Sequence, residues 1–124
     1  MPSVLMINLA PEKQNLLQIL SIRLNFSCRN VEPAEQAGRI SDLLKGKGLP
    51  DPSIRPFHDE MLIMDGFSHP DLDFLLNELI RTGHPIQLKA VTTPTNIGWT
   101  VIALHTQLML EHREMHHPAS GARR

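Results

Sequence analysis

Hydroxyl and amide side chains gather in one short segment of the sequence, where a strand is expected to end. Thr92, Thr93, Thr95 and Asn96 surround Pro94. Pro94 has no amide hydrogen and a fixed φ angle, so a strand must end there, and the residue before it is held extended. Thr95 or Asn96 can then cap the helix that follows. Such a junction offers free amide hydrogens and the positive end of a helix dipole, which suit an anion or a sugar-like group better than a cation.

The same segment also has a purely structural interpretation. Caps of this type are needed in every protein, so residues 92–96 are equally well explained as a turn that caps a helix and binds nothing. Both interpretations stay open at the level of the sequence.

Few residues could perform catalysis, so no catalytic residue is assigned. Asp65 could act as a base or a metal ligand with Lys89 as its electrostatic partner, but a single carboxylate is a poor ligand set for magnesium. A receiver domain would need an acidic pair after its first strand, where this chain has Asn8 and Leu9. Lys89 is also explained as an edge-strand lysine that discourages pairing between sheets. Phosphate-loop, G-x-S-x-G and H-E-x-x-H motifs are absent from the sequence, which favours a protein that is not an enzyme.

Seven histidines raise the question of a metal site. His112 and His116 have the i, i+4 spacing of zinc ligands, and His105 lies on the same face of the expected helix. Glu111 and Glu114 are near, but no carboxylate or cysteine clearly completes a ligand set. We therefore expect a solvated helix end, with no metal and no other cofactor.

Composition excludes several classes of protein. The chain of 124 residues is 41% hydrophobic and 20% charged, which fits one globular domain. A net charge of −1 without a basic stripe argues against nucleic acid as a partner. The apolar runs are shorter than the ~18 residues of a membrane span, so no membrane partner is expected. Because the N-terminus lacks the features of a signal peptide, we expect a cytoplasmic protein.

Two single residues have simple structural interpretations. Cys28 is the one cysteine, so an internal disulfide is impossible, and we expect it to be a small buried apolar side chain. Trp99, the one tryptophan, is expected to pack the last helix onto the sheet, with stacking on a ligand as the alternative.

Four strands and four helices must position these residues. Residues 3–9 and 60–64 are almost continuously apolar, which is typical of central strands covered on both faces, whereas 26–31 and 86–91 include polar residues and are expected at the edges. Apolar residues at helical spacing predict helices over 11–24, from 32 or 33 to 44, over 69–82 and over 96–116, the third of them capped by Ser68. Residues 1–117 would form one domain with a long loop at 45–58, followed by a disordered tail at 118–124.

The alternation of strands and helices predicts a three-layer α/β fold, βαβα-loop-βαβα, with a four-stranded parallel sheet in the order 2-1-3-4. This is the flavodoxin-like or receiver-like arrangement, shortened by a strand. Ligands of such folds bind where the carboxyl ends of the central strands diverge. That crevice would be bordered by Asn8, Asp65, Ser68, Thr92, Thr93, Thr95 and Asn96, with Lys89 and Trp99 in support.

The C-terminal half of the sequence resembles a known family. The segments FHDEMLIMDGF and IQLKAVTTPTNIGWTVIAL, together with Glu111-His112, are similar to an uncharacterised bacterial family, domain of unknown function thirty-seven eighty-three. The resemblance implies a small bacterial protein with no assigned activity. It also implies that Lys89, residues 93–96 and Trp99 belong to a family pattern.

Three functions remain in competition. The first is a non-enzymatic binding or regulatory module that holds a small polar ligand, or a peptide, over the turn at residues 92–96. The second is a protein–protein interaction module that self-associates, as a homodimer, through the fourth strand or through Ile102, Met109 and Leu110 of the last helix. The third is a small enzyme that uses Asp65 and Lys89.

Overall fold

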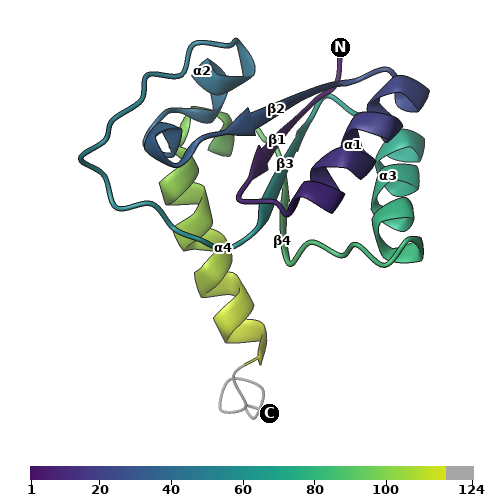
Figure 1. Cartoon of the computed structure of the whole chain (residues 1–124). Helices are drawn as coiled ribbons and strands as arrows, with labels where there is room; N and C mark the ends of the chain where they lie inside the picture. The colour runs from purple at the N-terminus through teal and green to yellow at the C-terminus, as the bar shows by residue number, and fades with distance from the viewer. Residues whose placement is uncertain (117–124) are drawn as a thin grey trace.

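A four-stranded sheet lies between two layers of helices (Figure 1). The computed structural model describes the backbone of residues 1–116 and the side chains of residues 1–113. In chain order the elements are β1 Ser3–Ile7, α1 Pro11–Leu24, β2 Ser27–Val31, the 3-10 turn η1 Pro33–Glu35, α2 Ile40–Leu44, β3 Met61–Asp65, α3 His69–Arg81, β4 Leu88–Val91, the 3-10 turn η2 Asn96–Gly98 and α4 Val101–His116. The expected three-layer α/β fold is confirmed, and the predicted tail at 118–124 lies outside the described residues.

The order of the strands in the sheet follows the prediction. The sheet has the order β2-β1-β3-β4, with the apolar strands β1 and β3 in the centre and the mixed strands β2 and β4 at the edges. The residues from Val4 to Ile7 and from Met61 to Met64 are almost completely buried. A strand covered on both faces needs such a continuous apolar run, which explains why position in the sheet could be predicted from composition.

The predicted all-parallel sheet is wrong at its centre. β1 pairs parallel with β2, and β3 pairs parallel with β4, but β1 and β3 are antiparallel. Ser3 lies opposite Asp65, and Ile7 lies opposite Met61. The sheet therefore consists of two parallel strand pairs that meet head to tail, and it differs from the flavodoxin-like arrangement in the direction of β3.

The path of the loop after α2 explains this reversal. Gly46 and Ser3 line the same pocket, so the chain has already returned to the end of the sheet from which a parallel third strand would start. Residues 47–60 then return to the opposite end. There the side-chain amide of Asn8 donates to the carbonyl oxygens of Phe57 and Asp59, at 2.8 and 3.1 Å. The buried Gln36 side chain accepts from the Phe57 amide at 2.9 Å, so β3 must start beside the end of β1.

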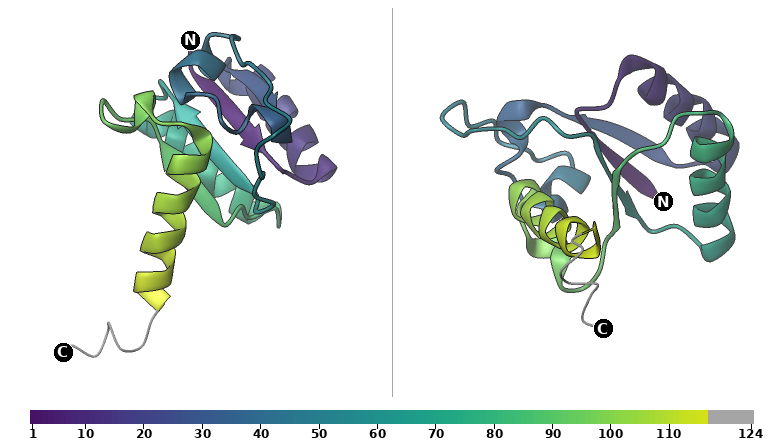
Figure 2. Two further views of the ribbon diagram at one scale, coloured as in Figure 1. Left: turned by 90° about the vertical axis from the view of Figure 1, so that its left-hand side faces the viewer. Right: turned by 90° about the horizontal axis from the view of Figure 1, so that it is seen from below.

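Each face of the sheet is covered by its own pair of helices. Val4, Met6, Leu62 and Met64 pack under α1 and α3. Leu5, Ile7, Met61 and Ile63 pack under α2 and α4. Figure 2 shows the two helical layers on either side of the sheet, with α4 extending beyond its edge. None of the helices in the described part of the chain is long and apolar enough to cross a bilayer.

The two halves of the molecule are related by an approximate two-fold axis perpendicular to the sheet. The axis passes between Leu5 and Ile63, which lie opposite each other at the centre of the β1–β3 pair. It exchanges β1-α1-β2-α2 with β3-α3-β4-α4, which is why α1 shares a face with α3, and α2 shares one with α4.

Two predicted helices are interrupted. The second breaks between η1 and α2, where Gly38 and an extended Arg39 intervene. The fourth breaks at Trp99, which is extended with φ −79° and ψ 157°. The helical periodicity of the apolar residues continues across both breaks, so it could not reveal them. α1 has the predicted bounds and ends, as expected, at Asn25 in the left-handed region with φ 59°.

We predict that Leu104→Ala lowers the free energy of unfolding by about 2–5 kcal/mol, because it leaves a cavity where α4 packs on the sheet. Leu104 is 3% exposed. Leu110→Ala on the same helix is the matched control, since Leu110 is 45% exposed and its truncation should cost about 0.5 kcal/mol or less. Urea denaturation measures both, and equal losses would contradict the observed orientation of α4.

Candidate functional site

The predicted site residues lie at both ends of the sheet and do not form one crevice. Because β1 and β3 are antiparallel, Asp65 at the end of β3 lies beside Ser3 at the start of β1. Asn8 is at the opposite end, where it anchors the loop. Asp65, Ser68 and residues 92–96 follow the ends of β3 and β4 at the other end of the sheet, where Thr92 contacts Asp65. The predicted single crevice is therefore wrong for Asn8, and a role of the other residues in binding stays a prediction.

A row of polar side chains crosses all four strands at this end of the sheet. We define the polar row as Ser27, Ser3, Asp65 and Thr92, all on the face covered by α2 and α4. The hydroxyl oxygens of Ser27 and Ser3 are 2.8 Å apart and hydrogen-bonded. The Thr92 hydroxyl donates to the Asp65 carboxylate. Two of the predicted residues thus meet two serines that the sequence did not single out.

Several polar groups of the turn after β4 form hydrogen bonds with one another. The amide of Thr93 donates to the side-chain oxygen of Asn96 at 2.8 Å, and the amide of Asn96 donates to the Thr93 hydroxyl at 3.0 Å. The Asn96 side chain also donates to the carbonyl of Val91 at 3.2 Å. Thr95 is exposed and makes no capping hydrogen bond. The capping residue is therefore Thr93, which corrects the expectation for Thr95 or Asn96.

Two further caps account for neighbouring hydroxyls. The Ser68 hydroxyl accepts from the Asp71 amide at 3.3 Å and caps α3, as predicted. The Thr100 hydroxyl accepts from the Ala103 amide at 3.1 Å at the start of α4. These contacts favour the structural interpretation of the turn over a ligand site centred on it.

Lys89 and Asp65 lie on opposite faces of the sheet. Leu88 and Ala90 face α4, so Lys89 between them faces the α1 and α3 side, whereas Asp65 belongs to the α2 and α4 side. The Lys89 ammonium donates to the carbonyl of Ile86, on the exposed edge strand β4. The catalytic pair proposed from the sequence is therefore not assembled.

A pocket of about 320 Å³ opens beside the polar row, between β2 and the end of α2. Its walls are Ser3, Val4, Leu5, Ser27, Cys28, Arg29, Leu43, Leu44 and Gly46. The pocket exists because α2 ends at Leu44, after five residues, and leaves this part of the sheet uncovered. The periodicity of the apolar residues predicted a helix that ends at Leu44. It could not show which strand residues are left uncovered because the helix ends there.

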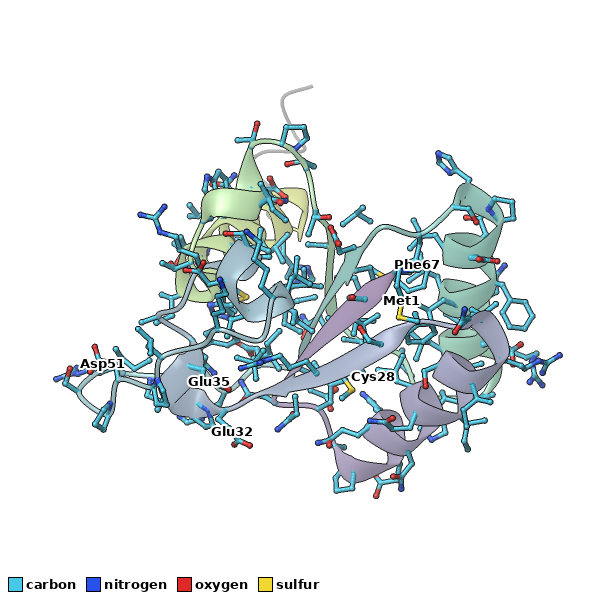
Figure 3. The ribbon with its side chains drawn as sticks, turned by 90° about the horizontal axis from the view of Figure 1, so that it is seen from above. Met1, Cys28, Glu32, Glu35, Asp51 and Phe67 are labelled. Carbon is cyan, nitrogen blue, oxygen red and sulfur yellow. The ribbon has the colours of Figure 1, made fainter. Side chains whose placement is uncertain are left out.

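Arg29 is the cationic group of this pocket. Its Nη2 donates to the Glu35 carboxylate at 2.7 Å, and the same carboxylate accepts from the amide of Glu32 at 2.9 Å. Among the described side chains, the Arg29 Nε is a buried donor without a hydrogen-bond partner. Figure 3 shows Glu32 and Glu35 together beside the end of β2 and Asp51 at the tip of the projecting loop. Arg29 thus keeps donor capacity after its ion pair is made.

Two glycines let the loop close over this ion pair. Gly46 has φ +75°, a conformation that side chains disfavour. A Cβ at Gly48 would lie 2.6 Å from a carboxylate oxygen of Glu35 and 2.9 Å from Nη2 of Arg29. These atoms are the ends of flexible side chains, so a larger residue at Gly48 would displace the Arg29–Glu35 pair, while Gly46 itself lines the pocket.

Cys28 borders the pocket but is not activated. It is half-buried, and its sulfur lies 3.6 Å from the carbonyl oxygen of Leu17. Burial raises the pKa of the thiol, and a hydrogen bond with Ser21 offsets this only in part. The thiol therefore stays protonated at neutral pH, in keeping with a packing role.

Trp99 packs against the core under α2 and α4, as expected, but it remains half-exposed. It lines a shallow, mostly apolar hollow on α4 together with Thr100, Ala103, Thr106 and Gln107. This hollow lies outside the pocket beside the polar row.

The histidines of α4 have other partners. His105 stacks on Phe57 with ring centroids 3.8 Å apart, and its Nε2 lies 2.9 Å from the Asp59 carboxylate. His112 lies 3.1 Å from the side-chain nitrogen of Gln87. The side chain of His116 lies outside the described residues. Within residues 1–113, no three His, Cys, Asp or Glu side chains are placed to hold a metal ion.

Glu60 holds the opposite end of the sheet, where it contacts Lys13 and the amide of Ala10. Burial acts to raise the pKa of Glu60, but the hydrogen bonds from Lys13 and Ala10 and the charge of Lys13 together lower it below its ordinary value. A lowered pKa in the folded state means that the ionised carboxylate stabilises the fold.

We predict that Thr93→Val lowers the free energy of unfolding by about 1 kcal/mol, because it removes the cap of the turn. Thr95→Val is the matched control and should change it by about 0.5 kcal/mol or less, since Thr95 makes no capping bond. Chemical denaturation measures both. A larger loss for Thr95→Val would show that the caps are assigned wrongly.

We also predict a pH-dependent role for Glu60. Glu60→Gln should be less stable than the parent protein at pH 7. The difference should shrink as the pH falls below about 4.3, the ordinary glutamate value, and through the lower folded pKa. Glu12→Gln, which neutralises an exposed carboxylate on α1, controls for net charge. Unfolding curves between pH 3 and 7 (roughly the range of carboxylate titration) measure the effect, and a difference independent of pH would refute it.

Comparison with known proteins adds one finding. Neither a curated protein nor a solved structure matches the chain. Residues 60–115 extend from the residue before β3 almost to the end of α4, and this segment matches the family described as Domain of unknown function (DUF3783).

Proposed function

We propose that the chain is a non-catalytic binding module for a small polar ligand that carries one anionic group. The ligand would lie in the pocket beside the polar row, between β2 and the end of α2. The observation that carries this proposal concerns Arg29: the residue lines the pocket, and its buried Nε lacks a partner among the described side chains. A buried N–H without a partner costs about 1–3 kcal/mol, and an acceptor from a ligand would remove that cost.

A comparison with the second half of the molecule, β3-α3-β4-α4, supports a ligand pocket in the first half. The two-fold axis relates the pair Ser3–Ser27 to the pair Met61–Leu88. The apolar pair is buried beneath α4, which runs for sixteen residues. In the first half α2 is short, and polar side chains stand where the second half has apolar ones. At equivalent positions, the second half therefore has a covered apolar core and the first half has an open, polar pocket.

A third pair of positions shows the same contrast. Arg29 beside Leu5 is related by the axis to Ala90 beside Ile63. Ala90 packs against the core, whereas Arg29 reaches Glu35 and the pocket. The core-packing role of Ala90 therefore does not account for the guanidinium group of Arg29. This group supplies the positive charge that an anionic ligand needs.

The charges of the site select the kind of anion. Glu35, at 8% exposure, already neutralises much of the Arg29 charge, and Asp65 adds a carboxylate to the polar row. These groups would repel a multiply charged phosphate more than a single carboxylate. Ser3 and Ser27 can hydrogen-bond hydroxyl groups, and Leu43 and Leu44 provide an apolar wall. A small carboxylate with hydroxyl or short apolar substituents fits this set best.

A second candidate function is an interaction with another protein through α4. The mostly apolar hollow around Trp99, with Leu110 45% exposed further along the same helix, favours it. Of the residues expected to form such a surface, Met109 instead packs against the core. Sedimentation equilibrium of the parent protein and of Leu110→Ser tests this function; identical monomer masses at high concentration would exclude self-association through α4.

We predict that a small carboxylate raises the melting temperature in a screen of hydroxy acids, amino acids, inorganic phosphate, nucleotides and sugars. At a hundred times its dissociation constant a ligand adds about 2.7 kcal/mol, which shifts the melting temperature by several degrees. The shift should disappear in Ser27→Leu, which copies the residue of the other half and fills the pocket.

The role of the Arg29 guanidinium in ligand binding is tested with a double variant, so that no buried charge is left unpaired. Arg29→Gln combined with Glu35→Gln replaces the ion pair by neutral groups, and it should also abolish the shift. Asn30→Leu, at the next and exposed position of β2, is the control and should keep it. A shift that survives both pocket variants, or a screen without any shift, would refute the proposed function.

A further inference from the structure

The contact between the halves pairs equivalent positions of the backbone. In the sheet, the pairs Ser3–Asp65 and Ile7–Met61 are related by the two-fold axis, with Leu5 and Ile63 at its centre. The backbone contact thus has the two-fold form of an interface between two identical subunits, although the side chains of the two halves differ.

A second contact on the axis follows the same rule. The amide of Ile40 donates to the carbonyl of Trp99 at 2.9 Å, and the amide of Val101 donates to the carbonyl of Gly38 at 3.1 Å. These two bonds flank the bridge between Arg39 and Thr100. Ile40 and Val101 are the first residues of α2 and α4, and both are fully buried. The halves are thus joined on two levels by the same reciprocal pattern.

The limits of the family match supply an independent observation. The matched segment, residues 60–115, is nearly the whole second half and includes none of the first. The matched segment is the unit β3-α3-β4-α4 of this chain, and the inner edge of its strand β3 needs a partner strand from outside the segment. In this chain the first half, of the same plan, fills that place.

We infer that each half recognises a βαβα unit of this kind through the β1–β3 contact and the bridge at residues 38–40 and 99–101, and that a second copy of the chain can supply the partner half. An unbroken covalent link between the halves is then unnecessary for recognition, and residues 57–59 of the cut chain keep their contacts with Asn8 and Gln36. Residues 49 and 50, in that link, are exposed, so the chain can be cut there without touching either contact. This inference does not depend on the proposed ligand.

The test uses the full chain with a specific protease site inserted between Leu49 and Pro50. The uncut variant must first melt at the parent temperature, which shows that the insertion leaves the fold intact. After cleavage, native mass spectrometry should show both fragments in one complex at the mass of the cut chain. Fragments that separate or precipitate on cleavage would overturn the inference.

Exchange between copies is measured on the same material. Cut protein labelled with ¹⁵N and unlabelled cut protein are mixed in denaturant and diluted back into buffer, with the uncut variant refolded in parallel. We expect complexes that join a labelled first half to an unlabelled second half, in statistical amounts. Failure of the cut protein to re-form complexes while the uncut variant refolds would show that the link itself is required, and would overturn the inference.

Discussion

The antiparallel pairing of β1 with β3 is the constraint on which the rest of the structure depends. It turns two βαβα halves head to tail, places α1 with α3 and α2 with α4, and sends the carboxyl ends of the central strands to opposite ends of the sheet. The crevice that a parallel α/β sheet forms at its switch point cannot exist in this arrangement. The polar row and the pocket lie where β3 and β4 end and where β1 and β2 begin.

Much of the fold follows from local patterns in the sequence. Continuous apolar runs predicted the central strands, polar interruptions predicted the edges, and Pro11 and Asn25 marked the ends of α1. The direction of β3 could not be predicted in this way, because it depends on the path of the preceding loop. Asn8 and Gln36 fix this loop at Phe57, which is more than twenty residues away from each of them in the sequence. Alternating strands and helices predict parallel pairing only when each connection is a single crossover, and this loop runs the length of the strands once more.

The candidate site was predictable only in part, for a related reason. Asp65 and Thr92 were identified from their place after apolar strands, and the structure brings them together. Thr93 and Asn96 use their hydrogen bonds within the turn, so a polar cluster in the sequence proved to be largely a cap. Arg29 gave no signal, because an arginine in an edge strand is ordinary until the early end of α2 leaves it beside a pocket.

The most direct test of this account is the direction of β3, measured by nuclear Overhauser effects between backbone protons of β1 and β3. Antiparallel pairing predicts contacts that link Ser3 with Asp65 and Ile7 with Met61. Contacts that link Ser3 with Met61 and Ile7 with Asp65 would show a parallel pair. They would contradict the two-fold arrangement, the location of the pocket beside the polar row and the exchange of halves together.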